Sequence, residues 1–154
     1  VPGVALIMSV YPLYADLVKD SVAAIEKYWP KHPPLSVGQN QQFDLRDRLL
    51  ADVSSSSYEY VVLMHEDFRL CGPVKQNLFD RCLAQLEQNP ALISCSLTWE
   101  PSDVGPYQYP KQPYTPDFQI IPIAWDYIIN FQMRMWKRSA LLKILSAIPS
   151  KTSN

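Results

Sequence analysis

Apolar residues along this chain fall into two alternating patterns. Four short runs have the length and composition of buried strands: 4–10, 35–38, 60–64 and 92–97. Three stretches between them repeat apolar residues every three or four positions, as amphipathic helices do: 17–28, 44–53 and 74–86. Strands and helices that alternate in this way are typical of a parallel sheet with helices on its faces. The pattern therefore predicts one doubly wound α/β domain with an open, mostly parallel sheet.

The later part of the chain interrupts this alternation with an insertion rich in proline and tyrosine, at about 99–122. Six of the 14 prolines fall inside it, so we expect a long, stiff and irregular segment. Its aromatic residues suit either stacking against sugar rings and bases or filling a lid over the core. Packing is the simpler explanation when the insertion is considered alone.

Beyond the insertion, residues 130–136 alternate between apolar and polar, which predicts a half-buried strand. Gln132 and Arg134 are expected on the polar side of that strand. Ser139 is a suitable N-cap residue for a last helix over 140–147.

The apolar run 60–64 ends abruptly at three ionisable residues, His65, Glu66 and Asp67. Packing explains such residues poorly, whereas ligands of open α/β sheets bind at the carboxyl ends of strands. Two adjacent acids suit Mg²⁺ or Mn²⁺, which takes one or two protein carboxylates together with substrate phosphates. The alternative is that Glu66 and Asp67 open a solvated loop and help to cap the helix expected after Pro73.

Composition excludes several classes of protein. The formal net charge of the 154 residues is −1, which gives no electrostatic case for binding nucleic acid or an anionic membrane. No apolar run approaches the ~20 residues that cross a bilayer, and the opening run lacks the basic leader of a signal peptide. Cys71, Cys82 and Cys95 have no CxxC spacing, which argues against a zinc site or disulfide scaffold and predicts a reducing, cytoplasmic location.

Three stretches carry a family resemblance. They read VALIMSVYPLYADLVKDSVAAI at the start, EYVVLMHEDFRL in the middle and INFQMRMWKRSALLKIL near the end. The first is similar to a donor-binding strand and helix, the second to a strand ending in an acidic metal motif, and the third to a late strand with glutamine, tryptophan and a basic pair. Together they resemble a small bacterial glycosyltransferase of the Rossmann-like nucleotide-diphospho-sugar transferase (GT-A) fold.

The resemblance implies that the chain binds a nucleotide-diphosphate sugar and transfers the sugar to an acceptor that the sequence does not name. It assigns Mn²⁺ or Mg²⁺ to Glu66 and Asp67, with Asp67 matching the metal-contacting aspartate. The cation would neutralise the departing diphosphate. The motif departs from the usual Asp-x-Asp pattern, because His65 stands where the first aspartate is expected.

The same resemblance implies contacts for the donor nucleotide at the end of the first strand and the start of the second helix: Ser9, Val10, Tyr11, Asp44 and Arg48. For Asp44 and Arg48 the alternative is an ordinary i,i+4 pair on the helix surface. Gln132 and Arg134 are expected to contact the diphosphate or the acceptor. Four acids around the insertion are candidates for the general base, and nothing in their spacing selects one: Glu100, Asp103, Asp117 and Asp126.

Such enzymes continue beyond their late helix into a catalytic acid and acceptor contacts, whereas six residues follow Ile148 here. We therefore expect a truncated chain that is a poor transferase; the alternative is a non-catalytic nucleotide- or sugar-binding or structural module. A different metal-dependent enzyme, such as a phosphatase or nuclease, ranks third because few other strand ends carry acids. The last helix has more apolar residues than one stripe needs, which predicts a homodimer: Leu141, Leu142, Ile144, Leu145 and Ile148.

Overall fold

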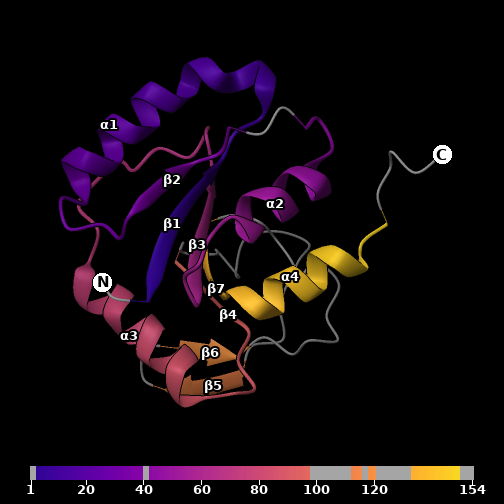
Figure 1. Cartoon of the computed structure of the whole chain (residues 1–154). Coiled ribbons are helices and arrows are strands. Elements are labelled where there is room, and N and C mark those ends of the chain that lie inside the picture. The colour runs from indigo at the N-terminus through magenta and orange to yellow at the C-terminus, as the bar shows by residue number, and fades with distance from the viewer. Residues whose placement is uncertain (1–2, 40–41, 98–111, 116–117, 121–132, 150–154) are drawn as a thin grey trace.

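A five-stranded sheet lies at the centre of the molecule (Figure 1). The computed structural model describes residues 3–39, 42–97, 112–115, 118–120 and 133–149. In spatial order the strands are β2 (Leu35–Val37), β1 (Val4–Ser9), β3 (Tyr60–His65), β7 (Arg134–Lys137) and β4 (Ser94–Ser96). β1 pairs in parallel with β2 and β3, whereas β7 is antiparallel to β3 and β4. The sheet is therefore mixed, and β7 is the reversed strand among the five.

β3 occupies the middle of this sheet, as its unbroken apolar run predicts. All of its residues from Tyr60 to Met64 are buried. It pairs with β1 along its whole length, up to the register Ser9↔His65. Because both faces of β3 are covered, its sequence has no polar alternation. The prediction of a central strand buried on both faces is confirmed.

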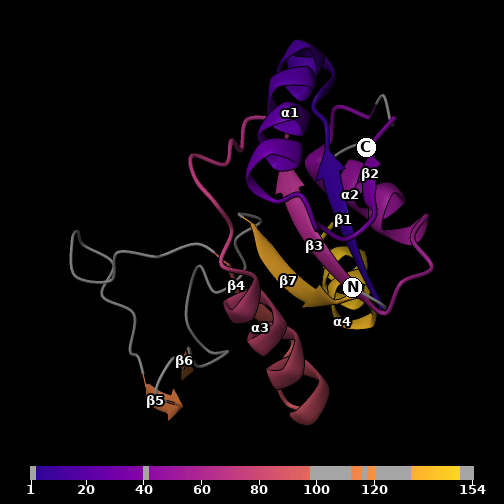
Figure 2. The same cartoon turned by 90° about the vertical axis from the view of Figure 1, so that its left-hand side faces the viewer.

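Helices cover both faces of the sheet, as Figure 2 shows from the side. The helices are α1 (Val18–Tyr28), α2 (Leu45–Ser54), α3 (Gln76–Gln88) and α4 (Arg138–Ala147). One buried cluster joins α1 and α3 to the sheet, and a second joins α2 and α4 to the opposite face. The α/β arrangement with helices on both faces is confirmed.

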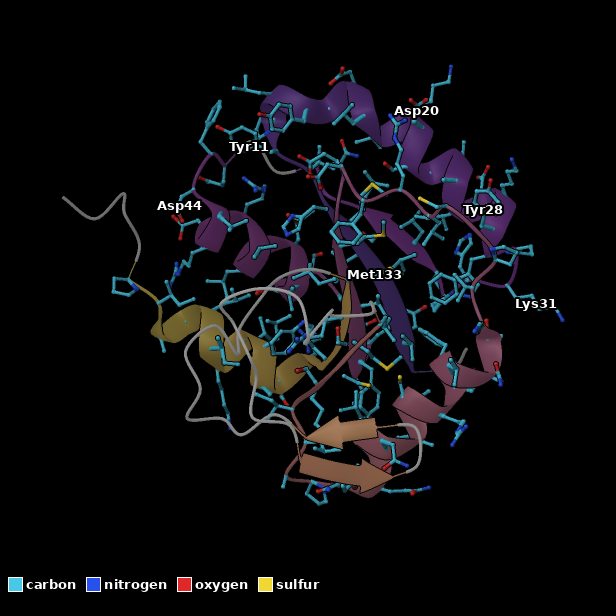
Figure 3. All side chains as sticks on the ribbon, turned by 180° about the vertical axis from the view of Figure 1, so that it is seen from behind. Tyr11, Asp20, Tyr28, Lys31, Asp44 and Met133 are labelled. Carbon is cyan, nitrogen blue, oxygen red and sulfur yellow. The ribbon has the colours of Figure 1, made fainter. Side chains whose placement is uncertain are left out.

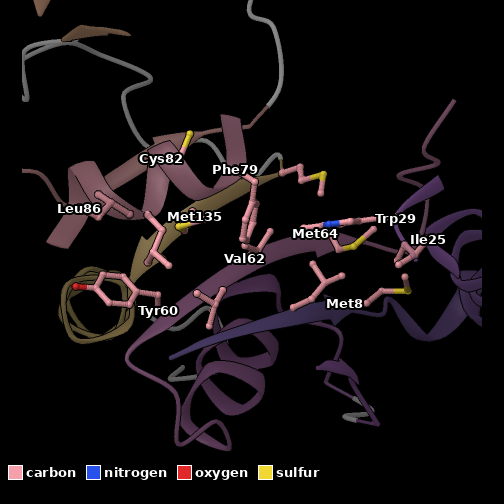
Figure 4. Packing of buried hydrophobic residues seen from close by; sticks show 14 of the residues in the cluster. Met8, Ile25, Trp29, Tyr60, Val62, Met64, Phe79, Cys82, Leu86 and Met135 are labelled. Carbon is pink, nitrogen blue, oxygen red and sulfur yellow. The ribbon is translucent and has the colours of Figure 1, made fainter. Parts of the chain in front are cut away.

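Alternate residues of the strands enter the two clusters. Met8 and Val62 lie in the cluster with α1 and α3, where Figure 4 shows them near Ile25 and Phe79. Ile7 belongs to the opposite cluster with α2 and α4. This division follows from the period-two alternation of side chains along a strand.

Two helices begin at positions other than those expected from the sequence. The N–H of Val74 donates to the carbonyl of Tyr28 and so keeps the chain after Pro73 out of the helix, and α3 begins only at Gln76. α4 follows β7 directly with Lys137 as its N-cap residue, so Ser139 lies inside the helix and does not cap it. Both expectations were wrong because contacts with distant segments fix these starts.

α2 and α4 lie antiparallel and each is tied to the other by an arginine. Arg46 Nε donates to the carbonyl of Leu145 at the end of α4 (3.0 Å). Arg138 Nε donates to the carbonyl of Val53 (3.2 Å) and its Nη2 to that of Ser54 (3.4 Å), at the end of α2. These bonds satisfy carbonyls that a helix leaves unpaired, with positive charge at the negative end of each helix dipole.

The apolar residues of α4 are used within the chain. Leu141 and Leu145 are fully buried, and Leu142, Ile144 and Ile148 pack partly buried against the same cluster. β7, which precedes α4, has a neighbouring strand on each side. The apolar surplus that suggested a dimer is thus accounted for by packing, and the homodimer stays a prediction.

Two short strands lie in the part of the insertion that the structure describes. β5 (Gln112–Thr115) and β6 (Phe118–Ile120) form an antiparallel pair. The expectation of a wholly irregular segment is therefore wrong for this part of the insertion. The hydroxyl of Tyr114 in β5 accepts a 3.0 Å hydrogen bond from Asn89 Nδ2 at the end of α3. Across the described residues, the longest apolar helical stretch falls short of what spanning a bilayer requires.

Candidate functional site

The carboxyl ends of β1, β2 and β3 meet at one edge of the sheet, because the three strands are parallel neighbours. A pocket of about 230 Å³ opens there, between the segment after β1 and the end of β2. Its lining is mainly apolar: Val10, Pro12, Ala15, Val18, Val37, Gly38 and Gln39. Val10, one of the predicted donor contacts, is among these lining residues, and the position of the pocket agrees with the general rule for ligands of open α/β sheets.

A buried polar network lies next to the pocket. Ser9 Oγ donates a 2.8 Å hydrogen bond to Asp52 Oδ2 and accepts a 3.3 Å bond from Arg48 Nε. Ser9 is fully buried, and Arg48 and Asp52 are 4% and 8% exposed. The hydroxyl therefore links a buried cation to a buried acid, and Ser9 supports the edge rather than offering its hydroxyl to a ligand.

Burial controls the ionisation of Asp52. It raises the pKa of the carboxyl above its ordinary value of 3.8, while the hydrogen bond from Ser9 and the charge of Arg48 oppose that change. Removing a carboxylate from water disfavours its charged form, and a nearby cation and a donor favour it. Burial and the polar neighbours therefore act in opposite directions on the pKa of Asp52, and Arg48 supplies the nearby positive charge.

Arg48 also organises the segment that leads into α2. Its Nη1 donates to the carbonyls of Gln42 (3.1 Å) and Phe43 (3.4 Å). Its guanidinium lies 5.1 Å from the ring centroid of Tyr11, a cation–π contact. The interpretation of Arg48 as a surface partner of Asp44 is wrong, because Arg48 is buried and bonds elsewhere.

Asp44 has a separate, local role. Its side chain accepts a 3.1 Å hydrogen bond from the N–H of Asp47, which makes it the N-cap residue of α2. Figure 3 places Asp44 and Tyr11 on the same side of the molecule. Asp44 therefore fixes the start of α2 next to the edge where the donor contacts were predicted.

Exposed aromatic and apolar side chains gather beside the pocket. The ring of Tyr11 lies 5.5 Å from that of Tyr14 and 5.7 Å from that of Phe43, in an edge-to-face arrangement with the latter. Phe43 is 61% exposed and Leu13 is 68% exposed, which is unusual for residues of this size. Flat apolar rings at the rim of a pocket are suited to stacking against a planar ligand.

The three ionisable residues at the carboxyl end of β3 differ in their surroundings. Glu66 is 4% exposed, and its Oε2 is buried without a hydrogen-bond partner, while its backbone carbonyl accepts from Ser21 Oγ in α1. Asp67 is exposed, and the side chain of His65 is half-buried. The pair predicted to hold a metal thus consists of one accessible acid and one enclosed acid.

The fit to a divalent cation follows from this difference. Asp67 offers one accessible carboxylate, which is enough for Mg²⁺ or Mn²⁺ when phosphate oxygens and water supply the other ligands. The unpartnered oxygen of Glu66 lies in the same turn. Within the described ranges, however, His, Cys, Asp and Glu nowhere gather in threes as a protein-only metal site would need.

The sequence predicts that Arg134 lies on the polar, solvent-facing side of its strand. In β7, however, the side chain of Arg134 is buried. It is 6% exposed, donates from Nη1 to Ser94 Oγ (3.4 Å), and its guanidinium lies 5.7 Å from the ring centroid of Trp136. Trp136 is fully buried in the core. The other predicted contact and the candidate bases lie outside the described residues: Gln132, Glu100, Asp103, Asp117 and Asp126.

Sequence reasoning missed two members of the site, Asp52 and Gly38. A Cβ atom on Gly38 would lie 2.8 Å from both carboxylate oxygens of Asp52, so the glycine makes room for the acid. The available signal was an acid between Leu49 and Val53, on the side of α2 that carries its buried residues. It lies one helical turn from Arg48, where the two side chains share a face.

The family resemblance rests on sequence motifs alone. Comparison of the chain with protein-family models gives no match, and comparison with curated proteins finds no relative.

Proposed function

We propose that this chain is a glycosyltransferase-like protein that binds a nucleotide-diphosphate sugar at the carboxyl edge of β1, β2 and β3. The observation that carries the proposal is the pocket of about 230 Å³ at that edge, next to the buried network of Ser9, Arg48 and Asp52. We include in the proposal the doubly wound, Rossmann-like transferase type and a reducing, cytoplasmic location.

The chain's own residues would divide the donor between them. The nucleobase would enter the pocket beside Val10, with the rings of Tyr11 and Phe43 as its stacking surface. Arg48 would keep that surface in place through its bonds to the segment before α2. Asp67 would hold the diphosphate end through Mn²⁺ or Mg²⁺, which stabilises negative charge on a departing diphosphate when bound.

Thermal unfolding with nucleotides tests the proposal. Millimolar uridine or guanosine diphosphate with Mn²⁺ should raise the melting temperature by roughly 5–10 °C if it exceeds its Kd about a hundredfold. Asp67→Asn should abolish the Mn²⁺-dependent part of that rise. Asp80→Asn is the matched control, because Asp80 is an exposed acid on α3 whose Oδ1 accepts from Gln76, and it should respond like wild type.

The absence of any rise with any nucleotide diphosphate would contradict the proposal. An equal rise in Asp67→Asn would show that nucleotide binds without the predicted cation contact, which contradicts the assignment of Asp67.

A non-catalytic nucleotide- or sugar-binding module is the second candidate. It is favoured by the enclosure of Glu66, which leaves Asp67 as the accessible acid of the pair. Binding energy realised equally in substrate and transition state gives affinity without rate. Release of nucleotide diphosphate from a nucleotide sugar, measured by chromatography, separates the two: turnover supports the transferase, and binding without turnover supports the module.

A further inference from the structure

Exposed apolar side chains are concentrated on two segments beside the pocket. Among the described residues, five large apolar side chains are exposed, and four of them lie here. Leu13 and Tyr14 belong to the 3₁₀ helix η1 (Pro12–Leu17), and Phe43 and Leu45 flank the residue that caps α2. Scattered exposed apolar residues are ordinary, whereas a cluster of them marks a contact surface.

Ring contacts hold the two segments together. The ring of Tyr11 lies 5.5 Å from that of Tyr14 and 5.7 Å from that of Phe43. Arg48 contacts the ring of Tyr11 and donates to the carbonyl of Phe43, so it anchors both segments. Figure 3 shows Tyr11 and Asp44, one residue of each region, on the same side of the molecule. Four side chains thus form one surface, here named the apolar patch: Leu13, Tyr14, Phe43 and Leu45.

The size of the apolar patch limits what can cover it. Its side chains are 41–68% exposed, which corresponds to roughly 350 Å² of apolar surface. A stable protein interface buries about 800 Å² on each partner. One aliphatic chain of about ten carbons matches the patch, because each CH₂ group corresponds to about 30 Å². The area therefore favours a single chain over a second copy of the protein.

A membrane surface is also a poor occupant. Insertion of a small apolar group gives only marginal membrane binding, and stable attachment adds a basic cluster or a second lipid anchor. The formal net charge of this chain is −1, which supplies no general attraction to anionic lipids. The occupant that remains is a chain carried by a small molecule.

The apolar patch adjoins the pocket. Pro12 and Ala15 line the pocket, and Leu13 and Tyr14 lie between them along η1. We propose that the apolar patch binds an aliphatic chain of the sugar acceptor, so that the acceptor is a lipid-like molecule. The identity of this molecule as the acceptor rests on the proposed function, whereas binding of the chain does not.

A series of chain lengths tests the binding. Methyl, hexyl and octyl β-glucoside share one headgroup, and each is titrated below its critical micelle concentration into the ¹⁵N-labelled, nucleotide-free protein. Affinity should rise about two- to fourfold for each CH₂ group that contacts the patch. The amide shifts should centre on residues 13–17 and 42–47, and methyl β-glucoside should cause none there.

Two variants remove apolar surface from the patch. Leu13→Ser and Leu45→Ser should each lower the affinity for octyl β-glucoside by roughly three- to tenfold. Leu78→Ser is the matched control and should bind like wild type, because it removes the fifth exposed apolar side chain, which lies on α3.

Two results would overturn chain binding at the patch. One is an affinity that does not depend on chain length, or that falls equally in Leu78→Ser. The other is self-association of the protein that Leu13→Ser abolishes and Leu78→Ser does not, because a second copy would then cover the patch.

A last titration separates this proposal from the proposed function. With uridine diphosphate and Mn²⁺ bound, octyl β-glucoside should bind at least as tightly as without them, because donor and acceptor occupy adjacent surfaces. Competition between the two ligands would overturn the assignment to the acceptor. Failure of uridine diphosphate to bind would contradict the proposed function, and the series measured without nucleotide would still support or overturn the patch as a chain-binding surface.

Discussion

Replacing Gly38 with alanine tests whether the carboxylate of Asp52 fills the space beside the end of β2. The new Cβ would lie 2.8 Å from both carboxylate oxygens and 3.0 Å from Cγ of Asp52, which is closer than such atoms pack. The carboxylate is not free to turn away, because its Oδ2 accepts the 2.8 Å hydrogen bond from Ser9. Either that bond breaks or β2 moves.

The expected cost follows from these two routes. Overpacking of a tight site costs about 1–3 kcal/mol, and loss of a hydrogen bond to a charged group costs about 1.5–3 kcal/mol. If the hydrogen bond breaks, the carboxylate can move and the overpacking is partly relieved, so the two costs do not add in full. Gly38→Ala should therefore lower the free energy of unfolding by about 2–3 kcal/mol. Urea unfolding followed by circular dichroism measures the change as a lower midpoint at unchanged slope.

Gly72→Ala is the matched control, because a Cβ atom there would meet nothing within 4 Å. It should change stability by less than about 1 kcal/mol. In an Asp52→Ala background, Gly38→Ala should cost almost nothing further, so that the two changes are strongly non-additive. Equal midpoints for Gly38→Ala and wild type, or full additivity with Asp52→Ala, would refute the reasoning.

Three further predictions concern other parts of the molecule. Arg138→Ala should lower the free energy of unfolding by about 1–2 kcal/mol in urea, because the carbonyls of Val53 and Ser54 lose the hydrogen bonds from its guanidinium; an unchanged midpoint would contradict this. Burial raises the folded-state pKa of Asp52 above 3.8, so wild type should lose stability relative to Asp52→Asn as pH rises through the window between 3.8 and the raised value; a gain there would contradict the shift. Phe43→Ala should weaken nucleotide binding by about 1–3 kcal/mol in calorimetry while leaving stability nearly unchanged, because Phe43 is 61% exposed; an unchanged Kd would contradict the stacking role.

The sheet could largely be predicted from sequence, because burial on both faces leaves a direct signal. The run from Tyr60 to Met64 has no polar residue and proves to be the central strand. Helix starts were harder, since Val74 is kept out of α3 by a bond to Tyr28 that is distant in sequence. Local capping rules do not contain such contacts, which is why Ser139 was also misplaced.

The candidate site was only partly predictable. Val10 and Tyr11 could be named because they follow a buried strand, and strand ends mark binding edges. The network behind them could not, because Ser9, Arg48 and Asp52 meet only when α2 packs beside the end of β1. Two arginine side chains that the sequence pattern placed at the surface are buried in the structure: Arg48 and Arg134.

The central claim is that a nucleotide diphosphate binds at the carboxyl edge of β1, β2 and β3. Titration of the ¹⁵N-labelled chain with uridine diphosphate and Mg²⁺, followed by amide chemical shifts, tests it most directly. We predict saturable shifts confined to the edge, at residues 9–15, 37–39, 42–44 and 65–68, with the amides of α3 unmoved. No shifts at millimolar nucleotide, or shifts centred on α3 and α4, would contradict the claim.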